Sequence, residues 1–385
     1  MATDFLHGVE TVTVERGPRH VQTVRSSVIG VIGTAPAADA AKFPLDTPVL
    51  VTGPQGFAGI GATGTLPKAL NAIYSTFPAF VVVVRVNEGA DAAATKTNII
   101  GGIDTTTGAL EGVHAFRAAE SVLGVSPMLL IAPGFTGDHQ ADGGDAVVNA
   151  LNTQAERLRA HAIVTGPSTT DTDAINFREG FSSRRIFVVD PKVNGGDDPA
   201  PLVAALIAKT DHTEGFWQSP SNRVLDGVVK VDRPIDFALG DANTSANLLN
   251  ENEVATIIRD DGFRLWGNRT CSDDPKWAFL SVSRTADMVD LSIMKAHRWA
   301  VDRAITKGYF DDVSGSVNAY LRNLEARGAI LGGKCWVDPD FNTPTDISGG
   351  RATFSYDFTP PSPAERVTFR SSVVDDYVSN LFAAS

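Results

Sequence analysis

The chain has 385 residues, of which 43% are hydrophobic and 20% charged, enough for two domains or for one large domain with an insertion. Its formal net charge of -12 argues against a nucleic-acid-binding protein, which needs a basic surface, and against an anionic membrane as partner. The two cysteines, Cys271 and Cys335, cannot form a disulfide framework and lack zinc-ligand spacing, so we expect buried free thiols.

The N-terminal residues carry neither the basic segment nor the apolar segment of a secretory signal, so we expect a cytoplasmic product. The longest apolar run, residues 79–84, is too short to cross a bilayer. We therefore expect no membrane insertion.

Residues 1–25 have the pattern of a strand but too little apolar material for a core. Apolar and polar residues alternate between residues 7 and 15, a segment that contains Val9, Thr11, Val12 and Val14. A lone strand needs the sheet edge of another unit. We therefore predict that residues 1–25 form an N-terminal arm that pairs with a neighbouring subunit.

Residues 26–210 alternate between strand and helix patterns. The predicted strands are residues 27–33, 47–52, 80–86, 128–132, 162–165 and 186–190. The predicted helices are residues 66–77, 111–123, 146–158 and 201–209. This order predicts an α/β layer.

The pattern changes after about residue 210. Residues 228–235, 351–359 and 366–374 are predicted strands, and residues 286–305 and 313–327 are predicted amphipathic helices. Gly328 stands where a left-handed residue would close the second helix. The last residues form a short alternating tail whose apolar members are Val374, Tyr377, Val378, Leu381 and Phe382.

The expected fold class is therefore mixed α/β, with an inner α/β domain, an inserted outer α/β domain and extended strand arms at both ends. The predicted boundaries are 1–25 for the N-terminal arm, 26–90 for an α/β segment leading into the outer domain, 91–210 for the outer domain, 211–372 for the inner domain and 373–385 for the C-terminal arm.

A glycine motif suggests a dinucleotide site. Gly59, Gly61 and Gly64 match G-x-G-x-x-G, a strand precedes them and a helix follows. However, residues 53–58 separate the strand from the first glycine, and Thr65 with Pro67 places the helix start after the last one. A flexible loop is the favoured interpretation, and a nucleotide-binding oxidoreductase remains the alternative.

Residues 138–145 hold several acidic side chains at alternating positions, a pattern that suits calcium. No bidentate glutamate closes the run as in an EF-hand, so a solvated loop is favoured. The sequence contains no G-x-S-x-G, H-E-x-x-H or P-loop motif. We therefore expect no catalytic, cofactor-binding or metal-binding residues, and no enzymatic activity.

Several segments, in order, resemble the contractile tail sheath family. They are residues 7–10 (HGVE), 26–35 (SSVIGVIGTA), 46–51 (DTPVLV), 216–222 (FWQSPSN), 227–229 (GVV), 248–250 (LLN), 263–270 (FRLWGNRT) and 283–289 (SRTADMV). The chain is most similar to the short sheaths of temperate contractile-tailed phages, and also to R-type pyocin sheaths. The resemblance is weakest between about residues 90 and 210.

The resemblance implies a structural subunit that polymerises as a six-start helix of hexameric rings around a tail tube. It implies terminal arms that complete a neighbour's sheet by β-augmentation and act as hinges while subunits rotate. Contraction would drive the tube through the host envelope for genome ejection, with no nucleotide required. The implied partners are other copies of the chain, the tube protein, and baseplate and tail terminator proteins, in a virion tail assembled in the host cytoplasm. A bacteriocin or type VI-like particle is the alternative machine.

The helix over residues 313–327 is our predicted contact with the tube. Val317, Leu321 and Leu324 recur at helical spacing and should face the subunit. The remaining faces, which we expect to bind the tube, carry Asn318, Arg322, Asn323, Glu325 and Arg327.

Overall fold

A computed structural model describes residues 21–138 and 144–381 of the chain. Its helices are α1 (Leu66–Thr76), α2 (Ala92–Ile100), α3 (Ala119–Leu123), α4 (Ala146–Leu158), α5 (Asp171–Glu179), α6 (Ala200–Thr213), α7 (Ser245–Glu251), α8 (Leu280–Ala296), α9 (Lys307–Ala326) and α10 (Pro344–Ser348). Its strands are β1 (Val28–Thr34), β2 (Pro48–Val51), β3 (Phe80–Val86), β4 (Leu129–Ile131), β5 (His161–Thr165), β6 (Ile186–Val189), β7 (Arg223–Val224), β8 (Val254–Arg259), β9 (Phe263–Trp266), β10 (Gly333–Trp336) and β11 (Ser355–Phe358).

One nine-stranded sheet, in the order β2-β3-β1-β4-β5-β6-β8-β9-β7, forms the centre of the body, which we define as residues 26–279. The strands from β3 to β8 in this order run parallel, with Val28 opposite Phe80 in the β1–β3 pair. Every residue of β1 is buried, as expected for a central parallel strand covered on both faces. The mixed α/β class predicted from the sequence is confirmed.

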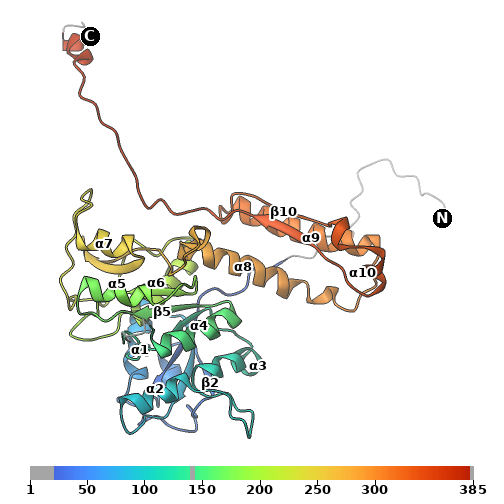
Figure 1. The fold of residues 1–385 in the computed structure, drawn as a ribbon, viewed down its shortest axis with the longest axis horizontal. Coiled ribbons are helices and arrows are strands. Elements are labelled where there is room, and N and C mark those ends of the chain that lie inside the picture. The colour runs from blue at the N-terminus through green and yellow to red at the C-terminus, as the bar shows by residue number, and fades with distance from the viewer. Residues whose placement is uncertain (1–20, 139–143, 382–385) are drawn as a thin grey trace, which may run out of the picture.

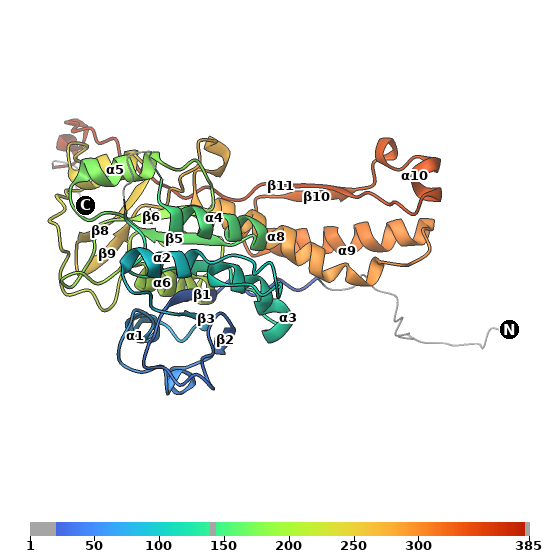
Figure 2. The ribbon, with the colours of Figure 1, turned by 60° about the horizontal axis from the view of Figure 1, so that its bottom comes forward.

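Helices cover both faces of this sheet (Figures 1 and 2). α1 and α6 bury Leu70, Ile73 and Val203 against one face. α2, α4 and α5 bury Ile99, Leu151 and Phe177 against the other. Each such side chain contributes about 1.5–3 kcal/mol on burial, so both faces hold the body together.

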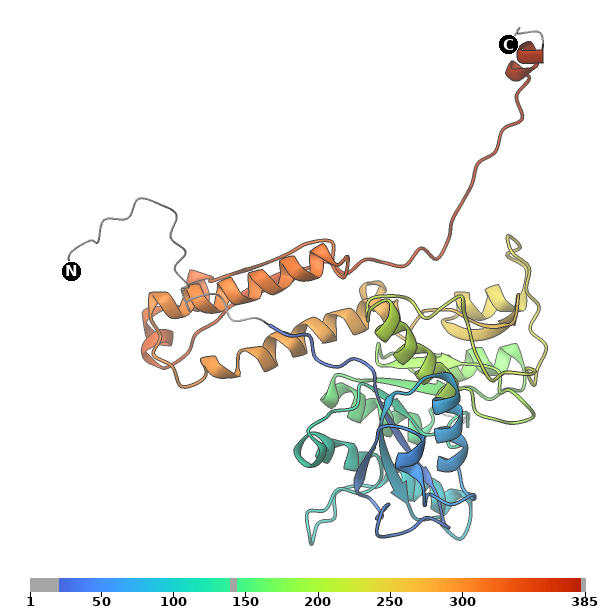
Figure 3. The same cartoon turned by 180° about the vertical axis from the view of Figure 1, so that it is seen from behind.

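A second unit, which we call the stalk (residues 280–359), projects from the body (Figure 1). In it α8 and α9 lie side by side, and the separate two-stranded β10–β11 sheet runs along α9 (Figure 3). Helix α9 buries Val317, Leu321 and Leu324 in the stalk core and ends at Ala326, and Gly328, two residues later, has a φ of +74° that favours glycine. The predicted helical face and its glycine terminator are confirmed, although α9 begins at Lys307, earlier than predicted.

Residues 21–26 are fixed to the stalk before β1 begins. Val21 is 3% exposed and belongs to the stalk core. The Val24 N–H donates to Ser292 Oγ at 3.1 Å, and Thr23 Oγ1 lies 3.1 Å from the Tyr320 hydroxyl. A free N-terminal arm can therefore include residues 1–20 only, which lie outside the described residues.

Some predicted elements are wrong. Residues 228–235 form no strand, since β8, β9 and β7 already form that end of the sheet. Val231 makes a single isolated β-bridge to Val193. Residues 366–374 form no strand because the described chain offers them no partner. The predicted helix 286–305 is α8, which ends at Ala296 and leaves Met294 58% exposed. The segment 111–123 is largely a 3-10 helix, Gly112–Ala118, followed by α3.

The nine-stranded sheet continues across residues 90/91 and 210/211, where the sequence analysis placed domain boundaries. The architecture changes at the start of α8, from a layered sheet to a helical stalk, and the predicted domain boundaries stay predictions. Which part faces inward in an assembly stays a prediction.

Candidate assembly surfaces and a buried charge cluster

The C-terminal segment leaves the molecule after one anchoring contact. Glu365 accepts two hydrogen bonds from the Arg269 guanidinium, at 2.7 and 2.6 Å, which tie the chain to the body. Beyond this pair the chain extends away from the body and the stalk (Figure 1). Val367, Phe369 and Val373 are 66%, 92% and 100% exposed. Their odd-numbered spacing puts them on one face of an extended strand, so an apolar strand face has no partner here.

The predicted C-terminal arm residues belong to the same segment. Val374, Tyr377 and Val378 are exposed. Leu381 ends the 3-10 helix Asp376–Leu381. Phe382 lies outside the described residues, as do the N-terminal arm residues Val9, Thr11, Val12 and Val14. The exposed apolar surface also begins earlier than the predicted boundary at residue 373, at Val367.

The β10–β11 sheet has one blocked edge and one open edge. The Asn318 side chain donates to the Cys335 carbonyl and accepts from the Cys335 N–H, both at 2.8 Å. Since both backbone groups of Cys335 point away from β11, those of its partner Tyr356 point away from β10. Within the described chain β10 is the single strand neighbour of β11. The outer edge of β11 is therefore the edge at which a further strand can be added.

A cleft of about 480 Å³ opens at the base of this sheet, lined by Leu331, Gly332 and residues 357–359. Leu331 is 67% exposed there. A strand paired along β11 would thus meet an apolar surface as well as backbone groups.

The five predicted tube-contact residues fall into two groups, those with a partner inside the subunit and those exposed on α9. Asn318 is occupied with the backbone of β10, and Arg327 lies over the Trp217 ring at 5.1 Å, so both have structural partners within the subunit. Arg322, Asn323 and Glu325 are exposed on α9. These three remain available for an external contact.

The loop that carries the glycine motif packs closely against other segments of the same chain. Gly61 and Gly64 have φ of +82° and +94°, and a Cβ on Gly64 would lie 2.3 Å from the Thr34 carbonyl oxygen. Ile60 is 3% exposed, so one side chain of this loop is anchored in the core.

The motif borders the place where doubly wound sheets bind ligands, between the carboxyl ends of β1 and β4. There the Thr34 N–H donates to Thr65 Oγ1 at 3.1 Å, and the Gly134 N–H donates to Asp198 at 2.8 Å. The protein's own oxygens thus occupy these donors, which disfavours the dinucleotide interpretation.

The acidic loop at 138–145 is described only at its ends, since residues 139–143 lie outside the described chain. Asp145 caps α4 by accepting hydrogen bonds from Val147 and Val148, and Asp138 pairs with Lys96. Among the described residues no group of three or more His, Cys, Asp or Glu side chains is placed to hold a metal ion. No helix of the described segments is long and apolar enough to span a bilayer.

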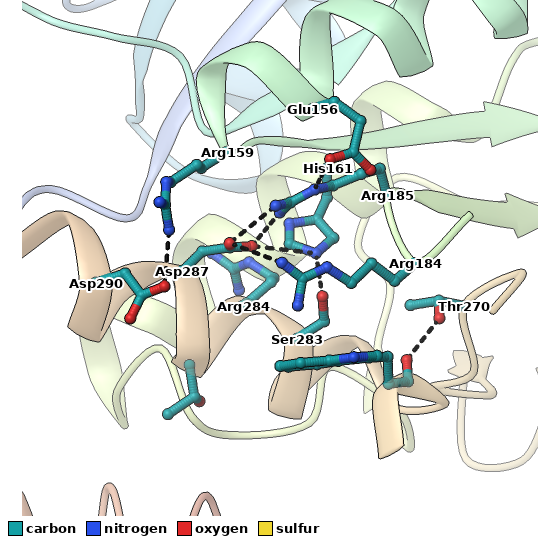
Figure 4. Close-up of polar contacts among 12 residues, drawn as sticks. Glu156, Arg159, His161, Arg184, Arg185, Thr270, Ser283, Arg284, Asp287 and Asp290 are labelled. Carbon is teal, nitrogen blue, oxygen red and sulfur yellow. Dashed lines mark hydrogen bonds and ion pairs between the residues drawn. The ribbon is translucent and has the colours of Figure 1, made fainter. Parts of the chain in front are cut away.

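A cluster of buried charges joins α8 to the body (Figure 4). Asp287, whose side chain is 1% exposed, pairs with both terminal nitrogens of Arg185, one of them at 3.0 Å. The Arg184 guanidinium lies 3.5 Å from the same carboxylate and 4.1 Å from the centre of the Trp277 ring. Charge-assisted, bidentate contacts of this kind have strict geometry.

Further contacts extend the cluster along α8. Arg284 donates to Asp211 at 2.8 and 2.5 Å and to the Ser26 carbonyl at 3.2 Å. Asp290 accepts from Arg159 at 2.7 Å and from the Tyr356 hydroxyl at 2.6 Å. The cluster therefore reaches from the start of β1 to the β10–β11 sheet.

His161 is the one imidazole in this cluster. Its Nε2 lies 2.9 Å from Ser283 Oγ and 3.8 Å from Asp287. Burial lowers the pKa of His161 well below its usual 6.5, and the charges of Arg185, Arg284 and Arg184 lower it further. Burial raises the pKa of Asp287, and Arg185 opposes that effect. His161 is therefore neutral in the folded protein.

Mild acid should destabilise the protein through His161. Below about pH 6.5 the unfolded chain takes up a proton that the folded chain does not, so the free energy of unfolding falls by up to about 1.4 kcal/mol per pH unit. In His161→Gln this contribution should disappear. Urea unfolding of both proteins between about pH 7.5 and pH 5.5 tests this, and curves that fall in parallel would contradict it.

The sequence pattern did not predict this cluster. Ser283, Asp287 and Asp290 recur at helical spacing, but such a polar stripe is usually the solvent-facing side of a helix. Asp287 meets Arg184 and Arg185, about 100 residues away in sequence, so no local pattern pointed to the contact.

Two family models match the chain. The phage tail sheath protein central domain matches residues 108–271, and the phage tail sheath C-terminal domain matches residues 272–373. The junction between the two models falls just before α8, close to the change from body to stalk.

Relatives match along the whole length. The chain is 39% identical to a prophage major tail sheath protein of Pseudomonas aeruginosa (strain UCBPP-PA14) and 36% identical to the tail sheath protein of Escherichia phage P2, each over 98% of both chains. It is 34% identical to the major tail sheath protein of Serratia phage KSP20, over 100% of this chain and 99% of that one.

Solved structures share the fold. A chain from the contracted baseplate of the anti-feeding prophage aligns with a TM-score of 0.73 and 19% identity, over 97% of this chain and 99% of that one. A chain from the contracted helical sheath of the same particle aligns with a TM-score of 0.70 and 18% identity, over 95% and 99%.

Proposed function

Given that this chain belongs to the phage tail sheath family and is a subunit of a contractile sheath, we propose that its subunits are linked by exchange of a C-terminal strand. In this proposal residues 366–374 of one copy pair with the outer edge of β11 in the next copy. The copies together form a helix of hexameric rings around a tail tube.

The observation that carries this proposal is that one chain has both an extended segment with an exposed apolar face and, at β11, a sheet edge without a partner in the described residues. Val367, Phe369 and Val373 present an exposed apolar face, and the backbone of Tyr356 points away from β10. Pairing through main-chain hydrogen bonds gives affinity without fixing the angle between two subunits. The chain can then bend where Glu365 meets the paired strand, while the copies stay connected.

Polymerisation tests the proposed function directly. The purified full chain should form hollow, striated tubes visible by negative-stain electron microscopy. Monomers or closed globular oligomers across protein concentration and salt would count against a sheath subunit.

We propose that the stalk faces the tube and that the body lies outside it. Arg322, Asn323 and Glu325 on α9 would make the tube contact, a polar surface that can grip and then release. Exposed ion pairs are each worth about 0.2–1 kcal/mol, so only many copies together hold the tube firmly.

Arg322→Glu should therefore yield sheaths that lack a tube. The reversal changes the charge of the proposed tube contact at every copy, on a helix for which no contact between sheath subunits is proposed. Co-expression with the tube protein, followed by electron microscopy, measures the fraction of filled sheaths. Lys68→Glu on α1, where the side chain is 81% exposed, is the matched charge reversal on the body. Equal filling of both variants would show that α9 does not contact the tube.

The remaining roles follow from the same proposal. The sheath would contract on a signal from a baseplate, end at a terminator protein, and drive the tube through the host envelope for genome ejection. The relatives from phages favour a phage tail over a bacteriocin or type VI-like particle. Assembly would take place in the host cytoplasm, with the energy stored in the extended lattice. The chain's own oxygens occupy the donors beside the glycine motif, which counts against the alternative of a nucleotide-binding oxidoreductase.

A further inference from the structure

The C-terminal strand segment and the open edge of β11 belong to the same chain, so a copy could bind its own strand. Residues 359–365 connect the end of β11 to residues 366–374. A flexible connection would let the chain reverse, as in a β-hairpin, and pair with the β11 edge of the same copy. It would also hold the strand at an effective concentration on the order of mM, far above a protein solution on the order of µM. Exchange between copies therefore requires a connection that prevents this closure.

The connection starts from a fixed backbone. The Thr359 N–H donates to the Gly332 carbonyl at 3.1 Å, and the Thr359 carbonyl accepts from the Leu331 N–H at 2.7 Å. These two hydrogen bonds continue the pairing of β11 by one residue and set the direction in which the chain leaves the sheet. The chain then runs on past the end of the β10–β11 sheet and does not turn back along β11 (Figures 1 and 3).

Three prolines follow at once. Pro360, Pro361 and Pro363 each have a fixed φ of about −65° and no N–H to give to a turn or a strand. The residue before a proline is itself restricted to extended conformations, which applies to Ser362. In an extended polyproline conformation residues 360–363 advance the chain by about 12 Å, more than twice the spacing of about 4.8 Å between paired strands. The prolines therefore carry the chain away from the β11 edge.

A second fixed point follows the first position at which the chain could reverse. A turn centred on Pro363 and Ala364 is locally allowed, because proline suits the first central position of a turn. The next residue, Glu365, accepts hydrogen bonds from the Arg269 guanidinium at 2.7 and 2.6 Å. Arg269 is itself held, since its backbone forms a β-bridge with Phe279 and its guanidinium lies 5.3 Å from the centre of that ring. The bidentate pair thus fixes the chain on the body, away from β11.

We infer that residues 359–365, together with Arg269, form a directing segment that prevents each copy from pairing with its own C-terminal strand. The strand itself cannot choose between its own copy and the next one, because both β11 edges carry the same residues. A stiff connection excludes the edge that is nearest and leaves the edge of another copy, which is a form of selection against an alternative pairing. The inference rests on the proposed strand exchange and names what decides which copy receives the strand.

A loosened variant tests the directing segment in the full chain. It carries Pro360→Ser, Pro361→Gly, Pro363→Ser and Arg269→Gln, which remove the stiff residues and the second fixed point. Residues 366–374 should then close onto the β11 edge of the same copy, because the flexible connection keeps them close to it.

Arg223→Gln is the matched control. Like Arg269, Arg223 donates from two nitrogens to both oxygens of one carboxylate, that of Glu214. The side chains of Arg223 and Glu214 are 28% and 43% exposed, against 31% and 45% for Arg269 and Glu365. The control therefore removes an equivalent ion pair from the body without touching the connection.

Two measurements report closure within one copy. Below the concentration at which tubes form, amide hydrogen exchange followed by mass spectrometry should find residues 366–374 exchanging freely in the parent and in the control. In the loosened variant they should exchange at least about tenfold more slowly, and about tenfold more protein or above should be needed to form tubes, because closure competes with exchange between copies.

Free exchange of residues 366–374 in a folded loosened variant, or tube formation at the parent's protein concentration, would overturn the inference and leave strand exchange standing. Should the loosened variant not fold, Pro363→Gly with Arg269→Gln replaces it, and the same two outcomes decide. A parent chain that forms no tubes would instead count against the proposed function, whereas the exchange measurement tests the directing segment on monomers alone.

Discussion

A chain that ends at Glu365 should fold as the full chain does and should form no tubes. The residues removed are exposed from Arg366 to Val378, so their loss takes little from the core. Glu365 stays in place to keep its hydrogen bonds with Arg269. The deletion removes the strand that we propose to pair with β11 of the next copy, and with it the main-chain hydrogen bonds of that link between subunits.

Thermal unfolding and sedimentation of the truncated chain measure the two effects separately. The melting temperature should stay that of the parent, and pelletable tubes should disappear. Two point variants locate the cause: Phe369→Asp changes the apolar strand face, whereas Thr368→Asp changes its neighbour on the opposite face. Phe369→Asp should block assembly far more strongly. Normal tubes from the truncated chain would refute strand exchange at this end.

Removal of residues 1–20 should likewise prevent assembly and leave a folded subunit, because the predicted arm ends where the stalk core begins. The cut is placed at Val21 since that side chain is 3% exposed in the stalk core. Adding Val21→Asp to the truncated chain should lower the free energy of unfolding by at least about 1.5 kcal/mol, since a buried valine contributes about 1.5–3 kcal/mol.

The two N-terminal variants distinguish the role of residues 1–20 in assembly from the role of Val21 in folding. Urea unfolding should show parent-like stability for the truncation and a clear loss for the truncation with Val21→Asp. Electron microscopy should show tubes for neither. A truncated chain that assembles normally would mean that the N-terminal residues do not link subunits.

Hydrophobic periodicity was enough to predict the elements whose partners lie in one core. β1 and β3 are continuous apolar runs because helices cover both faces of the sheet, and α9 shows a clear apolar stripe. Residues 366–374 carry an equally clear strand pattern, yet no strand forms. We propose that the sheet this strand pairs with lies in another molecule, which a single chain does not supply.

Polar residues were harder to interpret. Asn318 lies beside the buried stripe of α9 and was assigned to the tube, but its amide pairs with the backbone of Cys335. Asp287 has the spacing of a solvent-facing residue and is buried against Arg185. Periodicity distinguishes apolar from polar positions, but it does not tell whether a polar side chain meets water or a distant partner.

The central claim is that sheath subunits are joined by a strand exchanged onto β11. A helical reconstruction by electron cryomicroscopy of tubes grown from the full chain tests it most directly. We predict density for residues 366–374 of one copy, hydrogen-bonded along the Tyr356 edge of the next copy, with Phe369 near the cleft at Leu331. A C-terminal segment folded back onto its own subunit, with the outer edge of β11 bare in the tube, would contradict the claim.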